Sequence, residues 1–192
     1  AQQTGTPLYI VHVTCKEALQ EIQEAQGKGI NVGGESCTHY LTVTKDVLDD
    51  PDFNKAAQYV CSPALRSQEH LDALWEALNR GLLTAVSSDH CGIDLAELKQ
   101  AGRDNFTNIP NGAPGAGDRL HMLWTEGVAK GRISKEKLVE VFATEPAKIN
   151  GIYPRKGALE IGSDADIVIF DPEYRGTIRL EDNPNGVDYN VY

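Results

Sequence analysis

Short apolar segments alternate with amphipathic ones along this chain, and that order restricts its possible folds more than any other feature. LYIVHV (8–13), INVGGESC (30–37) and LLTAV (82–86) have the length and side-chain types of strands. Between them, residues 15–27 and 67–81 place apolar side chains at helical spacing. Strands and helices that alternate through short connections predict parallel strands with crossover helices. We therefore expect an α/β fold, either a βα barrel or an open sheet.

Charge and hydropathy argue against some classes of binding partner. The 192 residues carry 28 acidic and 18 basic side chains, a formal net charge of -10, which argues against a nucleic-acid-binding surface. No stretch approaches the roughly 20 apolar residues of a membrane-spanning helix, and the first residues lack the features of a signal peptide. We expect a cytoplasmic protein that binds neither nucleic acid nor a membrane. The four cysteines form no CxxC pair, which favours reduced thiols over disulfides.

Two metal-capable side chains lie where predicted strands end. His12 is on the C-terminal half of the first strand, and Asp89 follows the strand 82–86. In parallel α/β folds, ligands and catalytic groups gather at the carboxyl ends of the strands. The pair therefore predicts a metal site at this edge. Each residue alone has a structural alternative, since His12 could be a core histidine bonded to a carbonyl and Asp89 could cap a helix.

Other polar residues are weaker candidates. A second His/Cys zinc site could be assembled from side chains near strand ends, but none has the close paired spacing of structural zinc ligands. These residues are His39, His90, Cys15, Cys37, Cys61 and Cys91. Ser62 lacks the GxSxG pattern of a serine nucleophile, and the proline after it suits a binding loop better.

The pattern of apolar and polar residues changes near Lys156. GALEIGSDADIVIFDP (157–172) combines a turn with alternating apolar residues, and no helical pattern follows it. We therefore divide the chain into an α/β part, residues 1–155, and a β-rich segment, residues 156–192.

Six segments together resemble the C-terminal half of the dihydropyrimidinase and D-hydantoinase family, which are cyclic amidohydrolases of the amidohydrolase superfamily. GSDADIVIFD is typical of the superfamily as a whole, whereas SPALR, GRDNFT and IPNG are more specific. The resemblance extends over nearly the whole chain. The segments are LYIVHVTCK (8–16), GESCTHYL (34–41), YVCSPALR (59–66), VSSDHCG (86–92), GRDNFTNIPNG (102–112) and IYPRKGALEIGSDADIVIFDP (152–172).

The resemblance implies a (β/α)8 barrel, with strands six to eight in residues 1–155, and a small β-sandwich that includes residues 156–192. It also implies two zinc ions at the carboxyl rim of the barrel. By position, His12 matches the histidine after strand six that binds one metal, and Asp89 matches the aspartate after strand eight that binds the other. Ser62 and the backbone of Asn111 would hydrogen-bond the flat imide face of the substrate.

The implied reaction is hydrolysis of a cyclic amide by a hydroxide that the two zinc ions share, with Asp89 as the general base. The implied substrate is a small dihydropyrimidine or hydantoin, and relatives are commonly homotetramers. The family's paired histidines, its carboxylated lysine that bridges the zinc ions and its strand-five histidine have no counterpart in this chain. We therefore expect this chain to be a fragment that is inactive alone, with catalysis by the full-length protein.

Two alternatives stay open. Allantoinase and dihydroorotase share the fold and the metals, although SPALR and IPNG favour the dihydropyrimidinase side. A non-catalytic scaffold, like the collapsin-response-mediator proteins, would keep the barrel. Those proteins have lost metal ligands, whereas His12 and Asp89 are retained here.

Overall fold

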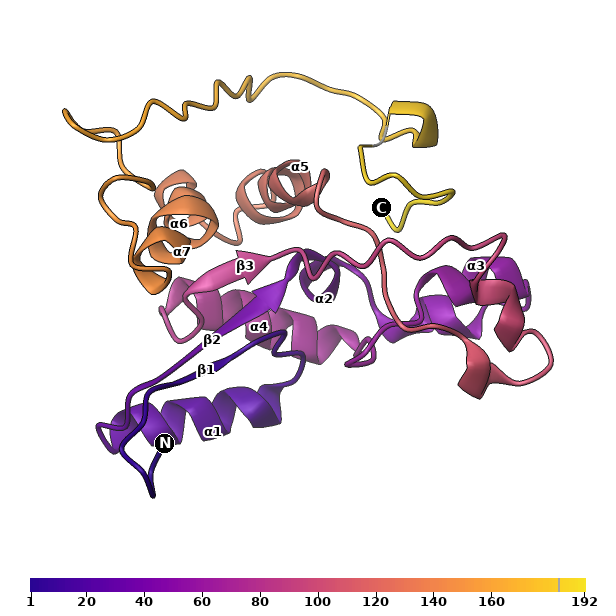
Figure 1. Ribbon diagram of the computed structural model, residues 1–192, viewed down its shortest axis with the longest axis horizontal. Coiled ribbons are helices and arrows are strands. Elements are labelled where there is room, and N and C mark those ends of the chain that lie inside the picture. The colour runs from indigo at the N-terminus through magenta and orange to yellow at the C-terminus, as the bar shows by residue number, and fades with distance from the viewer. Residues whose placement is uncertain (183) are drawn as a thin grey trace.

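Three parallel strands form the sheet on which the rest of the chain is arranged. The computed structural model describes residues 1–182 and 184–192. The strands are β1 (Leu8–Ile10), β2 (Val32–Cys37) and β3 (Ala85–Ser87), in the order β1-β2-β3. Because both pairings are parallel, the carboxyl ends of all three strands lie at the same edge of the sheet (Figure 1). The predicted α/β fold, the C-terminal portion of a (β/α)8 barrel, is confirmed.

Helices connect and follow these strands. The α-helices of the described residues are α1 (Lys16–Gly27), α2 (Thr38–Thr42), α3 (Phe53–Gln58), α4 (Gln68–Asn79), α5 (Arg119–Met122), α6 (Lys135–Val139) and α7 (Glu145–Ile149). The 3-10 helices are η1 (Lys45–Asp49), η2 (Lys99–Gly102), η3 (Phe106–Asn108) and η6 (Leu180–Asp182), and the π-helical segments are η4 (Leu123–Val128) and η5 (Glu140–Thr144). The two π-helical segments directly continue α5 and α6.

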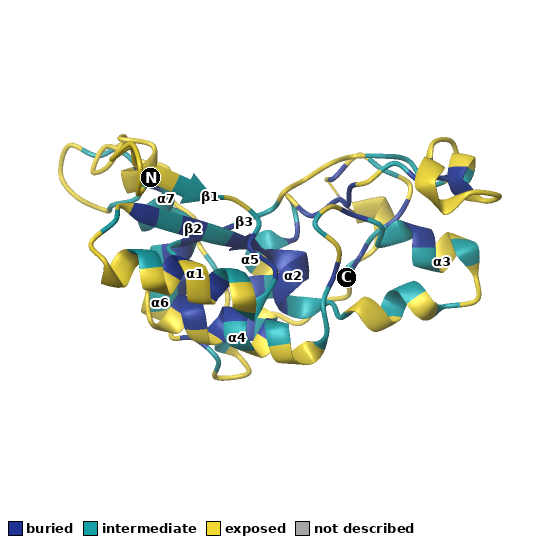
Figure 2. Cartoon of the chain, turned by 90° about the horizontal axis from the view of Figure 1, so that it is seen from below, coloured by how far each residue is buried: buried dark blue, intermediate teal, exposed yellow. Residues whose placement is uncertain are grey.

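The core lies between the sheet and the helices. Figure 2 shows α1, α4 and α6 on the same side of the three strands. Helix α1 buries Leu19 and Ile22, and α4 buries Leu74 and Leu78. Burial of each such side chain stabilises the fold by roughly 1.5 to 3 kcal/mol. The indole Nε1 of Trp75 on α4 donates a hydrogen bond to a carbonyl oxygen of α2 at 2.9 Å, which ties α4 to the carboxyl edge of the sheet.

The segment 157–172, for which the sequence predicts a strand, has no strand in the structure. It runs along the outside of the molecule in Figure 1, and its apolar side chains Ile161, Ile167 and Ile169 are exposed. A strand forms only when another backbone pairs with it, and no described residue supplies that partner. The division into residues 1–155 and 156–192 stays a prediction.

The end of the chain returns to the body of the molecule. Tyr189 and Val191 are buried and pack with Ala113 in a small apolar cluster. All four cysteines, which are among the described residues, are free. Within the described residues, no helix has both the length and the apolar character needed to cross a bilayer.

Candidate metal and substrate site

Each of the three strands places a metal-capable side chain just beyond its carboxyl end. His12, His39 and Asp89 each stand two residues after the last residue of β1, β2 and β3, respectively. His12 and Asp89 share a second feature, a left-handed backbone with φ of 41° and 45°. This conformation costs a residue other than glycine roughly 1 to 2 kcal/mol. Such strain persists where the surroundings enforce it, and it is concentrated at functional sites.

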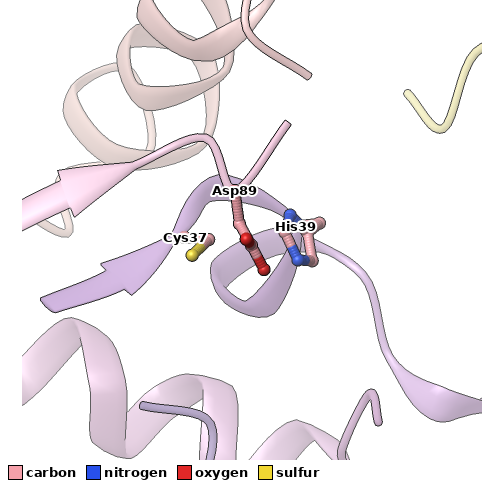
Figure 3. A group of neighbouring side chains, drawn as sticks. All are labelled: Cys37, His39 and Asp89. Carbon is pink, nitrogen blue, oxygen red and sulfur yellow. The ribbon is translucent and has the colours of Figure 1, made fainter. Parts of the chain in front are cut away.

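Asp89 belongs to a close group of three side chains. One ligand atom each from Cys37, His39 and Asp89 lies within 4.8 Å of the other two. In Figure 3 the Asp89 carboxylate, on the loop after β3, lies between the thiol at the end of β2 and the imidazole on α2. A carboxylate and an imidazole this close are suited to hold one divalent cation.

The side chain of His39 is buried, and the described residues offer its ring no hydrogen bond. Its side chain is 3% exposed, and neither ring nitrogen has a hydrogen-bond partner among the described residues. Burial lowers the pKa of His39 to about 4, the Asp89 carboxylate opposes this effect, and the His12 imidazole adds to it. The imidazole is therefore neutral near pH 7, the protonation state in which histidine binds a metal.

Cys37 is the member of the group least suited to bind a metal. Burial raises the pKa of its thiol to about 12, and the neighbouring Ser87 hydroxyl offsets only part of this rise. The Cys37 Sγ and Ser87 Oγ atoms are 3.3 Å apart. Since a metal binds the thiolate rather than the thiol, the donors that fit a cation here are the imidazole and the carboxylate.

His12, the histidine that the sequence favours, lies outside this closest group. Its side chain is half-buried, and its charge contributes to the low pKa of His39, so the two imidazoles are close enough to interact. From the sequence alone, His39 is among the weaker candidates. The sequence signal that could have raised its rank is its position directly after the predicted strand 30–37, because the carboxyl ends of parallel strands lie at one edge of the sheet.

Ser62 and Asn111 lie on two loops that the backbone joins. Both side chains are exposed. The amide of Gly112 donates to the carbonyl of Val60 at 3.0 Å, which links the loop before Ser62 to the loop that carries Asn111. The structure therefore brings the two predicted substrate-binding segments together.

The same loops connect to the segment after Asp89. The amide of Cys91 donates to the carbonyl of Ala113 at 3.0 Å. On the opposite side, the Tyr40 hydroxyl of α2 donates to the carbonyl of Pro63 at 2.7 Å. The Ser62 loop is thus tied to α2, and the Asn111 loop to the segment after β3.

The low pKa of His39 predicts a loss of stability in acid. Between about pH 6.5 and pH 4, the unfolded chain binds a proton at His39 that the folded chain excludes. Stability must then fall as the pH falls, by up to about 3 kcal/mol. We expect the metal-free protein, kept with a chelator, to lose more free energy of unfolding between pH 7 and pH 4.5 than its His39→Gln variant. Equal losses would show that His39 titrates normally.

Comparisons with known proteins show what this chain is similar to. The model of the "Amidohydrolase family" matches residues 9–191. The chain is 46% identical to a D-hydantoinase of Ralstonia pickettii over all of its length and 42% of that protein's. It is 41% identical to a dihydropyrimidinase of Arabidopsis thaliana over all of its length and 36% of that protein's. The solved structure of a D-hydantoinase from Bacillus sp. AR9 superimposes with a TM-score of 0.96 at 47% identity, covering 99% of this chain and 42% of that one. The chain thus spans about two fifths of the length of these relatives.

Proposed function

The chain belongs to the amidohydrolase family, and from that premise we propose that the full-length protein hydrolyses the amide C–N bond of dihydropyrimidines and hydantoins. The observation that carries the proposal is the close approach of Asp89 and His39 at the carboxyl edge of the sheet. His12 is near enough to lower the pKa of His39. The printed activities of the relatives supply the substrate class, because hydantoinases and dihydropyrimidinases account for the similar proteins named above.

We assign the metal ligands of this chain to His12 and Asp89. Imidazole and carboxylate are ordinary zinc donors, and the left-handed backbone at both positions gives a physical reason to regard them as functional. His39 is a further candidate donor, since it is buried beside Asp89 without a hydrogen-bond partner among the described residues. When bound, a pair of zinc ions supplies Lewis acidity and lowers the pKa of water.

The role we propose for Asp89 is to move one proton. Its carboxylate accepts the proton of the water molecule that attacks the ring carbonyl. The same carboxyl group then delivers that proton to the ring nitrogen as the C–N bond breaks, so that a carboxylic acid and an amide or urea nitrogen are formed. Asp89 is exposed at the end of β3, which leaves its oxygens open to substrate.

Ser62 and Asn111 are proposed to hold the imide face of the ring. The Ser62 hydroxyl and the backbone of Asn111 offer hydrogen-bonding groups on two adjacent loops. A bound ring that lacks the matching polar atoms would cover these groups without pairing them, at a cost of about 1 to 3 kcal/mol each. This cost would favour cyclic imides over other cyclic amides.

Activity assays test the proposed function. We expect the full-length protein to hydrolyse dihydrouracil or hydantoin, to lose activity with a chelator and to regain it with zinc. Preference for allantoin or dihydroorotate would assign it to those relatives instead. Absence of turnover together with absence of bound metal would support the non-catalytic scaffold. A homotetrameric state and a cytoplasmic location also stay predictions, which sedimentation and cell fractionation measure.

Replacing Ser62 tests the substrate loop. We expect Ser62→Ala to raise KM by roughly fivefold to a hundredfold, since one hydrogen bond to substrate is lost, while kcat changes little. Ser163→Ala, at a half-buried position on the segment 157–172, is the matched control, and its KM should equal that of the wild type. An unchanged kcat/KM in Ser62→Ala would remove Ser62 from the site.

A further inference from the structure

A lysine with no exposed surface lies beneath the two proposed substrate loops. Lys99, at the start of η2, is 0% exposed. Lysine is almost never fully buried unless its charge is satisfied. The complete burial of Lys99 therefore needs a physical explanation.

Main-chain carbonyls surround the Lys99 ammonium. Its Nζ donates to the carbonyl oxygens of Ala57 at 2.9 Å and Val60 at 3.1 Å, and that of Gln58 lies at 3.4 Å. It also donates to the carbonyl of Gly112 at 2.8 Å. Every acceptor recorded for this group in the described part of the chain is a backbone oxygen, and none is a carboxylate.

These acceptors belong to two separate segments. Ala57 and Gln58 are at the C-terminal end of α3, where a cation interacts favourably with the helix dipole. Val60 stands two residues before Ser62, and Gly112 directly follows Asn111. One ammonium group thus bridges the backbone of both loops that we assign to substrate binding.

The rest of the Lys99 environment is apolar or weakly polar. The Tyr189 ring lies 5.6 Å from Nζ, and the Tyr189 hydroxyl donates to the same Gly112 carbonyl at 3.4 Å. Burial lowers the pKa of Lys99 to about 8, while the Cys61 and Cys91 sulfurs act in the opposite direction. Burying a charge without a carboxylate partner costs free energy, and an apolar side chain could fill the same space without that cost. Stability alone therefore does not explain a lysine at this position.

We propose that Lys99 is a positioning residue for substrate binding, which sets the distance between the Ser62 loop and the Asn111 loop by binding the backbone of both. The inference rests on the proposed function, since it assumes that these loops contact the cyclic substrate. Lys99 itself does not touch the substrate in this scheme. Removing its donors would let the two loops separate and misalign their hydrogen-bonding groups.

Steady-state kinetics of the full-length Lys99→Met variant test this role. Misplacement of binding groups by about 1 Å can cost up to about a hundredfold in rate or binding, so we expect KM for dihydrouracil or hydantoin to rise at least about tenfold. Zinc content and kcat per bound metal should stay close to the wild-type values. A role in stability alone would instead reduce the fraction of folded enzyme and leave KM unchanged.

Two further variants complete the experiment. Lys55→Met, an exposed lysine on α3, is the matched control and should keep the wild-type KM. Lys99→Arg keeps the charge and several donors, and its KM should lie between those of the wild type and Lys99→Met. If Lys99→Met does not fold, the comparison of Lys99→Arg with the wild type decides, and an unchanged KM overturns the proposal.

Hydrogen exchange separates this proposal from the proposed function. In the folded Lys99 variant, amide exchange should rise in residues 57–63 and 108–114 together and stay unchanged in α1. A wild-type protein that hydrolyses no cyclic amide would refute the proposed function, whatever the exchange rates. An active wild type, with a variant whose KM and loop exchange are both unchanged, would refute only the role of Lys99.

Discussion

Asp89→Asn is expected to reduce the kcat of the full-length protein for dihydrouracil or hydantoin by about 10² to 10⁴-fold. The carboxamide has nearly the shape of the carboxylate, but it cannot accept the proton that general-base catalysis requires. It is also a weaker metal ligand, so the bound zinc per subunit should fall as well. Steady-state kinetics and elemental analysis of the same preparation measure both effects.

The variant should nevertheless fold. Asparagine tolerates the left-handed backbone that Asp89 adopts, with φ of 45°. Asp72→Asn, on the exposed face of α4, is the control and should retain activity and metal. Near-normal turnover in Asp89→Asn would falsify the general-base role.

Gly112→Ala is expected to destabilise the protein and to weaken substrate binding. Gly112 has φ of 152°, and an added Cβ would lie 2.7 Å from the Cβ and 2.8 Å from the Sγ of Cys91. Backbone strain and steric overlap should together cost about 2 kcal/mol or more. Because Asn111 immediately precedes this glycine, KM should rise as well. Chemical denaturation and steady-state kinetics measure the two effects.

A second glycine separates the steric effect from the backbone effect. Gly131 has φ of 70°, and no described atom lies within 4 Å of a Cβ built there. Gly131→Ala should therefore cost only the left-handed backbone term, about 1 kcal/mol, and leave KM unchanged. Equal losses of stability in the two variants would contradict the close contact between Gly112 and Cys91.

The alternation of strands and helices was enough to predict the parallel sheet. Strand ends fixed by apolar periodicity placed Asp89 at that edge, and the structure confirms its position after β3. His39 was harder to rank because the sequence could not show its burial or its lack of hydrogen-bond partners. These properties depend on tertiary structure, which brings Asp89 beside the His39 ring although the two residues are far apart along the chain.

Local sequence preferences do not hold where a side chain makes a tertiary contact instead. Thr14 and Glu17 have the spacing of a helix capping box, yet α1 has no side-chain cap. The Thr14 hydroxyl instead accepts a hydrogen bond from the Arg66 guanidinium at 3.3 Å. Lys99 gave no sequence signal at all, because its acceptors are backbone carbonyls whose positions depend on the fold.

Anomalous scattering at the zinc absorption edge, from crystals of the full-length protein, is the most direct test of a metal site at the carboxyl edge of this sheet. We expect anomalous peaks within bonding distance of the His12 imidazole and the Asp89 carboxylate. Crystals grown with added zinc that show no peak at either side chain, or zinc bound only elsewhere, would contradict the proposed site.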